Sequence, residues 1–384
     1  MIRVSAPVVG KEELAAMAQA FELGYFGHGI KVLEFEARLQ EYLGAAQVVA
    51  VNSGSAALHL ALDALGIGPG DEVIVPSLTF VSCFQMISAT GALPVPCEVY
   101  PETLLMDVED VASKITPRTR ALMPVHYAGN PCDLKRLYRL ADQAGIRVIE
   151  DAAHALGSSY QGRLIGSFGD LICFSFDSIK NITCGEGGAV ICQDKELADI
   201  MRQKRLLGID RHATIDSGPT HRWFYRIPCQ GFRYHMSNLN AALGLAQLAK
   251  LPAFIKRRQQ IARRYDQALS SIKGLSLLKI DYDTVAPHIY VIKVHQGRRN
   301  ELMEFLRQQD IEASLNYIPN HRHEYYQQLY RERPWHLPVT EQAFAEILTL
   351  PLHCALTDED VERVIEQLYR FFELPLTAPR ESEG

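Results

Sequence analysis

Seven short apolar runs follow one another between residues 46 and 194, and they limit the possible fold more than any other feature of the chain. Helical spacing of apolar residues separates some of them, at Ser55–Leu65 and at Asp133–Gln143. Strands that read as continuous apolar runs, separated by helices, are typical of a mainly parallel sheet covered on both faces. We therefore predict an α/β fold with a mainly parallel central sheet and helices on both faces. The runs occupy residues 48–51, 72–77, 93–99, 121–127, 146–151, 171–176 and 189–194.

The pattern changes in the last third of the chain. A long helical stretch, Ser237–Ser270, leads out of the alternating region, and His288–Val294 then reads as a strand followed by amphipathic helical segments. This change predicts a second, smaller α+β domain. The predicted division is a large α/β domain at 1–245, a connecting helix at 246–270 and a small C-terminal domain at 271–384.

The overall composition is that of an ordinary globular protein, with 47% hydrophobic and 22% charged residues in a chain of 384. A net charge of −6 does not favour nucleic acid or an anionic membrane as a partner. Eight scattered cysteines without a C-x-x-C pair suggest reduced thiols, and no signal-peptide pattern or long apolar stretch is present, so we expect a cytoplasmic protein. No metal site is predicted, because residues 321–324 (HRHE) lack the H-E-x-x-H spacing.

Two residues at strand ends point to a specific chemistry. Asp151 ends the run at 146–151, and Lys180 lies just past the run at 171–176. Ligands of parallel sheets bind beyond the carboxyl ends of the strands. There a lysine amine can form a Schiff base with pyridoxal 5'-phosphate (PLP), while a carboxylate keeps the ring nitrogen protonated so that the ring accepts electrons. Each residue alone has an ordinary alternative, because most such lysines are solvated and strand-end aspartates often cap helices.

A phosphate site is predicted at the start of the first helix of this region. Residues 52–57 (NSGSAA) follow the first strand, and free N–H groups at a helix start bind phosphate when small residues allow close approach. A plain serine-capped helix is the alternative. Ser175 lies five positions before Lys180, where its hydroxyl could reach the same phosphate.

Two further side chains could hold a flat cofactor ring. Phe80 follows the run at 72–77 and could stack on a heteroaromatic ring, although an isolated phenylalanine there is more often core. His154, three residues after Asp151, could buttress that aspartate or cover the ring. A structural histidine with no role in the chemistry is the competing interpretation.

Taken in order, these motifs and others resemble the DegT/DnrJ/StrS family of PLP-dependent sugar aminotransferases, which has the fold-type-I aminotransferase architecture. The resemblance covers residues 1 to about 372, and the ordered set is far more specific than any single motif. The motifs are at 27–35 (GHGIKVLEF), 52–58 (NSGSAAL), 68–80 (GPGDEVIVPSLTF), 124–129 (PVHYAG), 150–155 (EDAAHA), 175–188, 241–248 (AALGLAQL), 317–321 (YIPNH) and 350–352 (LPL).

The resemblance implies a role for each matching residue. Lys180 would form the Schiff base with PLP and then shuttle the proton, and Asp151 would pair with the pyridine nitrogen. Phe80 and His154 would hold the ring. The phosphate would be bound by three small residues, namely Gly54, Ser55 and Ser175.

The resemblance also implies a homodimer with shared active sites. Many family members have an asparagine in a GYNYR-like segment that reaches the phosphate in the neighbouring subunit. Here that segment reads GFRYH at 231–235, and Arg233 could replace the contact with a charge-assisted one of about 1.5–3 kcal/mol or point elsewhere. Weaker candidates for the sugar-nucleotide site are Tyr25, Phe26, Gly29, Tyr317 and His321.

The implied function is transamination of a nucleotide-linked keto-sugar with glutamate as the amino donor, in the synthesis of amino sugars for surface polysaccharide, lipopolysaccharide or glycoconjugates. Residues 133–188 are especially similar to carbon-4 enzymes such as the one that makes UDP-4-amino-4-deoxy-L-arabinose, and the run TCGEGG at 183–188 supports carbon 4 over carbon 3. A carbon-3 enzyme is one alternative. Family dehydratases have histidine in place of the lysine, so Lys180 argues against that reaction. A non-catalytic binding protein would not need Asp151, Ser175 and Lys180 together.

Overall fold

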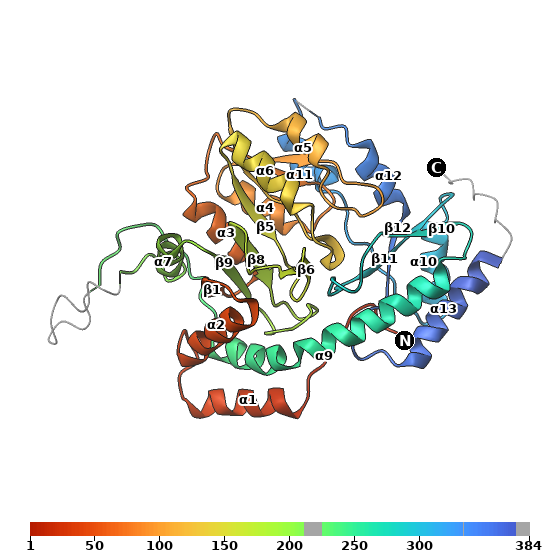
Figure 1. Cartoon of the computed structure of the whole chain (residues 1–384), viewed down its shortest axis with the longest axis horizontal. Helices are drawn as coiled ribbons and strands as arrows, with labels where there is room; N and C mark the ends of the chain where they lie inside the picture. Colours follow the sequence, from red (N-terminus) through yellow and green to blue (C-terminus); the bar gives the residue numbers. More distant parts are fainter. Residues whose placement is uncertain (211–224, 333, 374–384) are drawn as a thin grey trace.

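The computed structural model describes residues 1–210, 225–332 and 334–373, and a seven-stranded sheet lies at its centre (Figure 1). The strand order is β1-β9-β8-β5-β4-β2-β3. Only β9 runs antiparallel to its neighbours, β1 and β8, so the predicted mainly parallel sheet is confirmed. The strands are β1 (Gln47–Val51), β2 (Glu72–Pro76), β3 (Leu93–Cys97), β4 (Thr119–Leu122), β5 (Arg147–Asp151), β8 (Leu171–Ser175) and β9 (Gly188–Cys192).

Helices cover both faces of this sheet, as the apolar runs predicted. In β1, Val48 and Ala50 join one apolar cluster while Val49 and Val51 join another on the opposite face. A strand buried on both faces needs apolar residues at every position, which is why these strands read as continuous runs. One face packs on α2 (Ile30–Leu43), α5 (Val108–Lys114) and α6 (Leu134–Ala144), and the other on α3 (Gly54–Ala64), α4 (Ser82–Ala89) and α7 (Lys195–Lys204).

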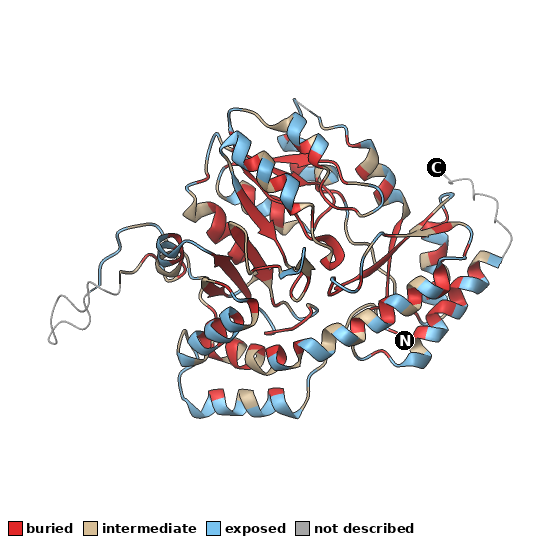
Figure 2. Ribbon diagram, in the orientation of Figure 1, coloured by how far each residue is buried: buried red, intermediate tan, exposed pale blue. Residues whose placement is uncertain are grey.

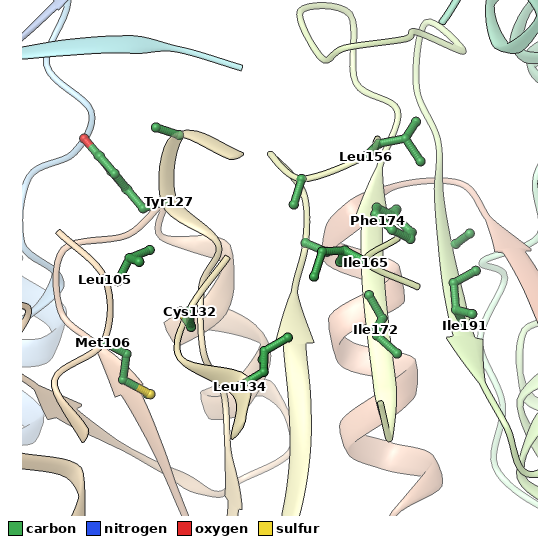
Figure 3. Close-up of a cluster of buried hydrophobic side chains, with 14 of the residues drawn as sticks. Leu105, Met106, Tyr127, Cys132, Leu134, Leu156, Ile165, Ile172, Phe174 and Ile191 are labelled. Atoms are coloured by element: carbon green, nitrogen blue, oxygen red, sulfur yellow. The ribbon is translucent and has the colours of Figure 1, made fainter. Parts of the chain in front are cut away.

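The burial pattern follows this layering. Figure 2 shows the central strands as mostly buried, whereas the covering helices alternate between buried and exposed positions. Figure 3 shows part of the first cluster, where Ile172 and Phe174 of β8 and Ile191 of β9 lie together. The two faces together give the sheet a rigid core, so the residues at its strand ends are held in fixed positions.

A single long helix, α9 (Asn238–Leu269), links the two halves of the molecule. Its N-cap is Ser237, whose Oγ accepts a hydrogen bond from the Asn240 N–H at 3.1 Å, close to the predicted start. The helix packs on α1 (Lys11–Glu22) and α2 at one end and on α13 (Asp358–Glu373) at the other (Figure 1). In the described part of the chain no helix is both long enough and apolar enough to cross a membrane.

The smaller part is built on a three-stranded antiparallel sheet with its own apolar cluster. The predicted domain boundaries at residues 245 and 270 stay a prediction. Two contacts between the smaller part and the large part bear on them. Ile2 pairs with Ile311 of the smaller part, and Tyr326 packs against Phe84 of the large part at a ring distance of 5.1 Å. The helices and strands beyond α9 that come before α13 are β10 (Leu275–Leu277), β11 (Tyr290–Val294), β12 (Ile347–Leu350), α10 (Arg299–Gln308), α11 (Glu324–Leu329) and α12 (Pro338–Glu346).

Short elements complete the described fold without altering its layers. They are the two-stranded ribbon β6 (Ser159–Tyr160) and β7 (Arg163–Leu164) and the 3₁₀ turns η1 (Tyr127–Gly129) and η3 (Asn320–Arg322).

The close packing of β9 against the turn after β1 can be tested at Gly188. A Cβ atom at Gly188 would lie 2.6 Å from the Ser53 carbonyl carbon and 2.8 Å from the Gly54 nitrogen, both of which are backbone atoms. We expect Gly188→Ala to lower the free energy of unfolding by about 1–3 kcal/mol, measured by chemical denaturation, because neither backbone can yield easily. Gly68→Ala is the control, since its Cβ would meet its nearest neighbour, the Thr90 carbonyl oxygen, at 3.6 Å. Equal stability of the two variants would contradict the packing argument.

Candidate active site

A cavity of about 470 Å³ lies past the carboxyl ends of the central strands. Its lining comes from several elements that are distant in sequence. Gly54 follows β1, Phe80 follows β2, Asp151 ends β5 and Lys180 follows β8. Tyr317 enters from the segment between α10 and β12. The strand-end rule therefore places the predicted lysine and aspartate at one site.

The start of α3 forms one wall of the cavity. Ser53 caps this helix, and its Oγ accepts a hydrogen bond from the Ala56 N–H at 3.0 Å. A Cβ atom at Gly54 would lie 2.8 Å from the Cβ of Ser175, so only glycine lets the start of α3 approach Ser175 this closely. The Ser55 hydroxyl lies 2.7 Å from that of Ser82. The free N–H groups of the first helical turn and the nearby hydroxyls form a cradle of the size and polarity that a phosphate needs.

Asp151 is buried and held on both carboxylate oxygens. Its Oδ1 accepts a hydrogen bond from the Ala153 N–H at 3.0 Å, and its Oδ2 accepts one from the Cys83 thiol at 2.8 Å. Burial, and secondarily the Asp151 charge, raises the pKa of Cys83 well above its ordinary value, so that this thiol stays protonated and remains a donor. Asp151 is thus a fixed negative charge in the wall of the cavity.

Lys180 lies at the end of a turn in which its N–H donates to the Asp177 carbonyl at 3.1 Å. Its amine is 3.4 Å from Nε2 of His288. Burial lowers the pKa of Lys180, while the charges of Asp151 and Asp177 act in the opposite direction. A lowered pKa enlarges the neutral fraction of the amine, which is the nucleophilic and basic form.

Aromatic side chains line the rest of the cavity. Phe80 is 53% exposed and lies 5.5 Å from the ring of Tyr317. The Tyr317 hydroxyl is 3.1 Å from Nε2 of buried His154. Within the described residues, His154 Nδ1 has no hydrogen-bond partner, which leaves one buried polar atom unsatisfied beside the cavity. The hydrogen bond of His154 goes to Tyr317 and not to Asp151, and its place beside the cofactor ring stays a prediction.

Eight predicted site residues therefore line one cavity, and five do not. Tyr25 and Phe26 are exposed, and Gly29 lies against Asn238 at the start of α9. His321 bonds Ser77 through Nδ1 at 2.7 Å and Glu341 through Nε2 at 2.8 Å. Arg233 is exposed outside the cavity of its own chain. The residues that the structure brings together are Gly54, Ser55, Phe80, Asp151, His154, Ser175, Lys180 and Tyr317.

Sequence reasoning missed two partners of the central residues. In the sequence, Cys83 is one of eight scattered cysteines and His288 is the first residue of a predicted strand. Their contacts with Asp151 and Lys180 span 68 and 108 positions, so no local spacing could have indicated them. No group of three or more potential metal ligands occurs in the described ranges.

Comparison with known proteins decides the family. Residues 7–369 match the model of the DegT/DnrJ/EryC1/StrS aminotransferase family. The chain belongs to this family. It is 40% identical over 368 residues to the spore coat polysaccharide biosynthesis protein SpsC of Bacillus subtilis, with 94% of this chain and 95% of SpsC covered.

Solved structures of similar chains share the whole fold. The sugar aminotransferase CalS13 from Micromonospora echinospora is 31% identical with a TM-score of 0.89, and the match covers 96% of this chain and 100% of CalS13. Spr1654 from Streptococcus pneumoniae, in its PMP form, is 30% identical with a TM-score of 0.91, and 97% and 99% of the two chains are covered. The fold-type-I architecture is thereby confirmed.

The DegT/DnrJ/EryC1/StrS family consists of PLP-dependent sugar aminotransferases, and the cavity fits this cofactor. The first-turn N–H groups of α3 and the nearby hydroxyls would hold the phosphate, and Asp151 would face the ring nitrogen. Lys180 would provide the amine for the covalent bond, and His154 has an unsatisfied buried nitrogen in the wall of the same cavity. The chain is a PLP-dependent aminotransferase.

The phosphate cradle can be tested at Gly54. We expect Gly54→Ala to raise the dissociation constant of PLP by about tenfold or more, or about 1.4 kcal/mol, because its Cβ would occupy the space beside Ser175. Titration of the apoprotein, followed by absorbance of the bound cofactor, measures this constant. Gly68→Ala serves again as the control. Unchanged PLP affinity in Gly54→Ala would place the phosphate elsewhere.

Proposed function

We propose that this enzyme transfers an amino group from glutamate to carbon 4 of a nucleotide-linked keto-sugar. The observation that carries the proposal is the buried Lys180 amine, which shares one cavity with Asp151 and the phosphate cradle in a chain of this family. The likeness to SpsC, a polysaccharide biosynthesis protein, and to the sugar aminotransferase CalS13 supports a sugar substrate. The run TCGEGG at 183–188 resembles that of carbon-4 enzymes of the family, which supports carbon 4.

The chain's own residues supply positioning and proton transfer. When bound, PLP supplies the electron sink for the carbon that loses its proton. Lys180 Nζ, whose pKa is lowered by burial, would take the proton from the α-carbon of the donor and hold it for the next transfer, a role typically worth about 10²–10⁴-fold in rate. The Ala153 N–H and the Cys83 thiol donate to the two oxygens of Asp151 and hold its carboxylate in place.

The cytoplasm is the proposed compartment, with a place in the synthesis of amino sugars for surface polysaccharides or glycoconjugates. All eight cysteines are free thiols in the structure, which suits a reducing environment. Nucleotide-linked sugars are small, charged substrates that enter an enzyme from water, so the active site needs an open cavity and not a membrane surface. Phe80, exposed at the rim, leaves the cavity accessible from solvent.

The substrate is tested with a panel of UDP-, dTDP- and GDP-linked 4-keto and 3-keto sugars and glutamate as donor. We expect 2-oxoglutarate to form with a 4-keto sugar, and NMR of the product to locate the new amine on carbon 4. Lys180→Ala is the inactive control, because it lacks the amine that moves the proton. Turnover of 3-keto sugars alone would overturn the carbon-4 assignment, and turnover of none would overturn the proposed substrate class.

We also propose a homodimer in which Arg233 reaches the phosphate site of the partner subunit. Two observations support it. Arg233 lies outside its own cavity, although Asn52 holds the backbone beside the phosphate cradle by donating from Nδ2 to the Arg233 carbonyl at 3.3 Å. Large apolar side chains are exposed on one stretch near the N-terminus, as expected of a surface that a partner covers. They are Phe21, Leu23, Tyr25, Phe26, Ile30 and Leu33.

Subunit mixing tests the shared site. We expect Lys180→Ala and Arg233→Ala to be weakly active or inactive alone, and their mixture to recover up to about a quarter of wild-type activity, since each heterodimer contains one intact site. A mixture of Lys180→Ala with Asp151→Asn is the matched control, because both residues lie in the cavity of one chain and no intact site can form. Equal activity of the two mixtures would show that Arg233 does not act in trans.

A further inference from the structure

His288 contacts the reactive lysine and lies outside every sequence motif. Its Nε2 lies 3.4 Å from Lys180 Nζ; His288 is buried, and Lys180 is half-buried and lines the cavity. An amine N–H donates to an imidazole nitrogen whether the amine is charged or neutral. In the tautomer with the ring proton on Nδ1, Nε2 of His288 accepts this hydrogen bond.

The backbone of His288 is held on both sides, and its ring packs against one neighbour. Its backbone N–H donates to the Ala128 carbonyl of the large part at 3.1 Å. Its own carbonyl accepts a hydrogen bond from Arg258 Nη1 of α9 at 3.0 Å. Its ring lies 4.3 Å from the ring of His154. The backbone from which the imidazole reaches Lys180 is therefore fixed, and the ring is buried.

Arg258 helps to hold the segment that carries His288. It is buried, and its Nη1 bonds two carbonyls, those of His288 at 3.0 Å and of Leu352 at 3.1 Å. A buried guanidinium that bonds main-chain carbonyls fixes the path of the chain, here the segment that carries His288 to the cavity.

The imidazole of His288 is neutral, so it can accept a hydrogen bond. Burial lowers its pKa well below the ordinary value, and the positive charges of Lys180 and Arg258 lower it further. The neighbouring imidazole of His154 is also kept neutral by burial, which lowers its pKa. Near pH 7 the ring facing Lys180 is therefore neutral and has one nitrogen free to accept a hydrogen bond.

We propose that His288 is a positioning residue that receives the hydrogen bond of the Lys180 amine whenever that amine is free, and so returns it to one place for proton transfer. A free lysine side chain has up to about 2 kcal/mol of rotamer entropy, which a fixed acceptor removes before the reaction. The inference rests on the proposed transamination, in which the lysine is released once in each half-reaction.

The test compares His288→Phe, which keeps a ring against His154 but has no acceptor, with His288→Gln, which keeps an acceptor. The half-reaction with glutamate is followed by loss of the visible absorbance of the lysine-bound cofactor. We expect His288→Phe to slow it about 10- to 100-fold and to raise the isotope effect with α-deuterated glutamate, because an ill-placed amine makes proton transfer limiting. His288→Gln should stay within about threefold of wild type.

A second readout needs no turnover. Apoprotein of His288→Phe should capture PLP covalently about tenfold more slowly than wild type, since the amine is no longer aimed. Its affinity for pyridoxamine phosphate, which cannot bond the lysine, should be unchanged. The matched control is His353→Phe. His353 is likewise buried, but its Nε2 faces the Arg3 carbonyl at 3.1 Å and not the lysine.

The outcomes separate this inference from the proposed function. If wild-type holoenzyme fails to react with glutamate, the proposed donor is wrong. If wild type reacts and His288→Phe shows the same rate, isotope effect and PLP capture, the positioning role is overturned. Should His288→Phe fail to fold, His288→Gln decides alone, and a loss of more than about tenfold in its half-reaction would equally overturn the role.

Discussion

The desolvation of one amine is the physical constraint on which this molecule depends. Moving a lysine ammonium out of water is costly, and the cost lowers the pKa of Lys180 while the charges of Asp151 and Asp177 oppose that change. These opposing effects on the pKa leave the Lys180 amine nucleophilic in a site that also contains a carboxylate. They require a site that is dry around the lysine yet open to substrate, which a loop on the surface of the molecule could not provide.

The central sheet meets this requirement through close backbone approach at its carboxyl edge. Gly188 lets β9 pack on the turn after β1, and Gly54 lets the start of α3 pack closely on Ser175. Because both faces of the sheet are buried, the strand ends cannot shift independently. The cradle, the carboxylate and the lysine are thus positioned by the same core, and a change in packing at one of them is transmitted to the others.

Local pattern predicted the parts of the site that follow directly from strand ends. Asp151 and Lys180 were found because continuous apolar runs give the strands and because parallel strands present their carboxyl ends at one edge. His321 was predicted near the sugar, yet the chain turns it towards Ser77 and Glu341. That contact, like those of Cys83 and His288, joins segments far apart in sequence, and its existence depends on how the smaller part packs on the sheet.

The smaller part of the molecule consequently also supplies residues to the region of the cavity. Tyr317 and His288 both reach the cavity region from residues beyond α9, and Arg258 on α9 ties the His288 segment to Leu352 after β12. A movement of α9 relative to the sheet would therefore change the partner of the Lys180 amine as well as the width of the cavity. The environment that makes the lysine reactive is assembled across the whole chain, although the lysine itself follows a strand of the large sheet.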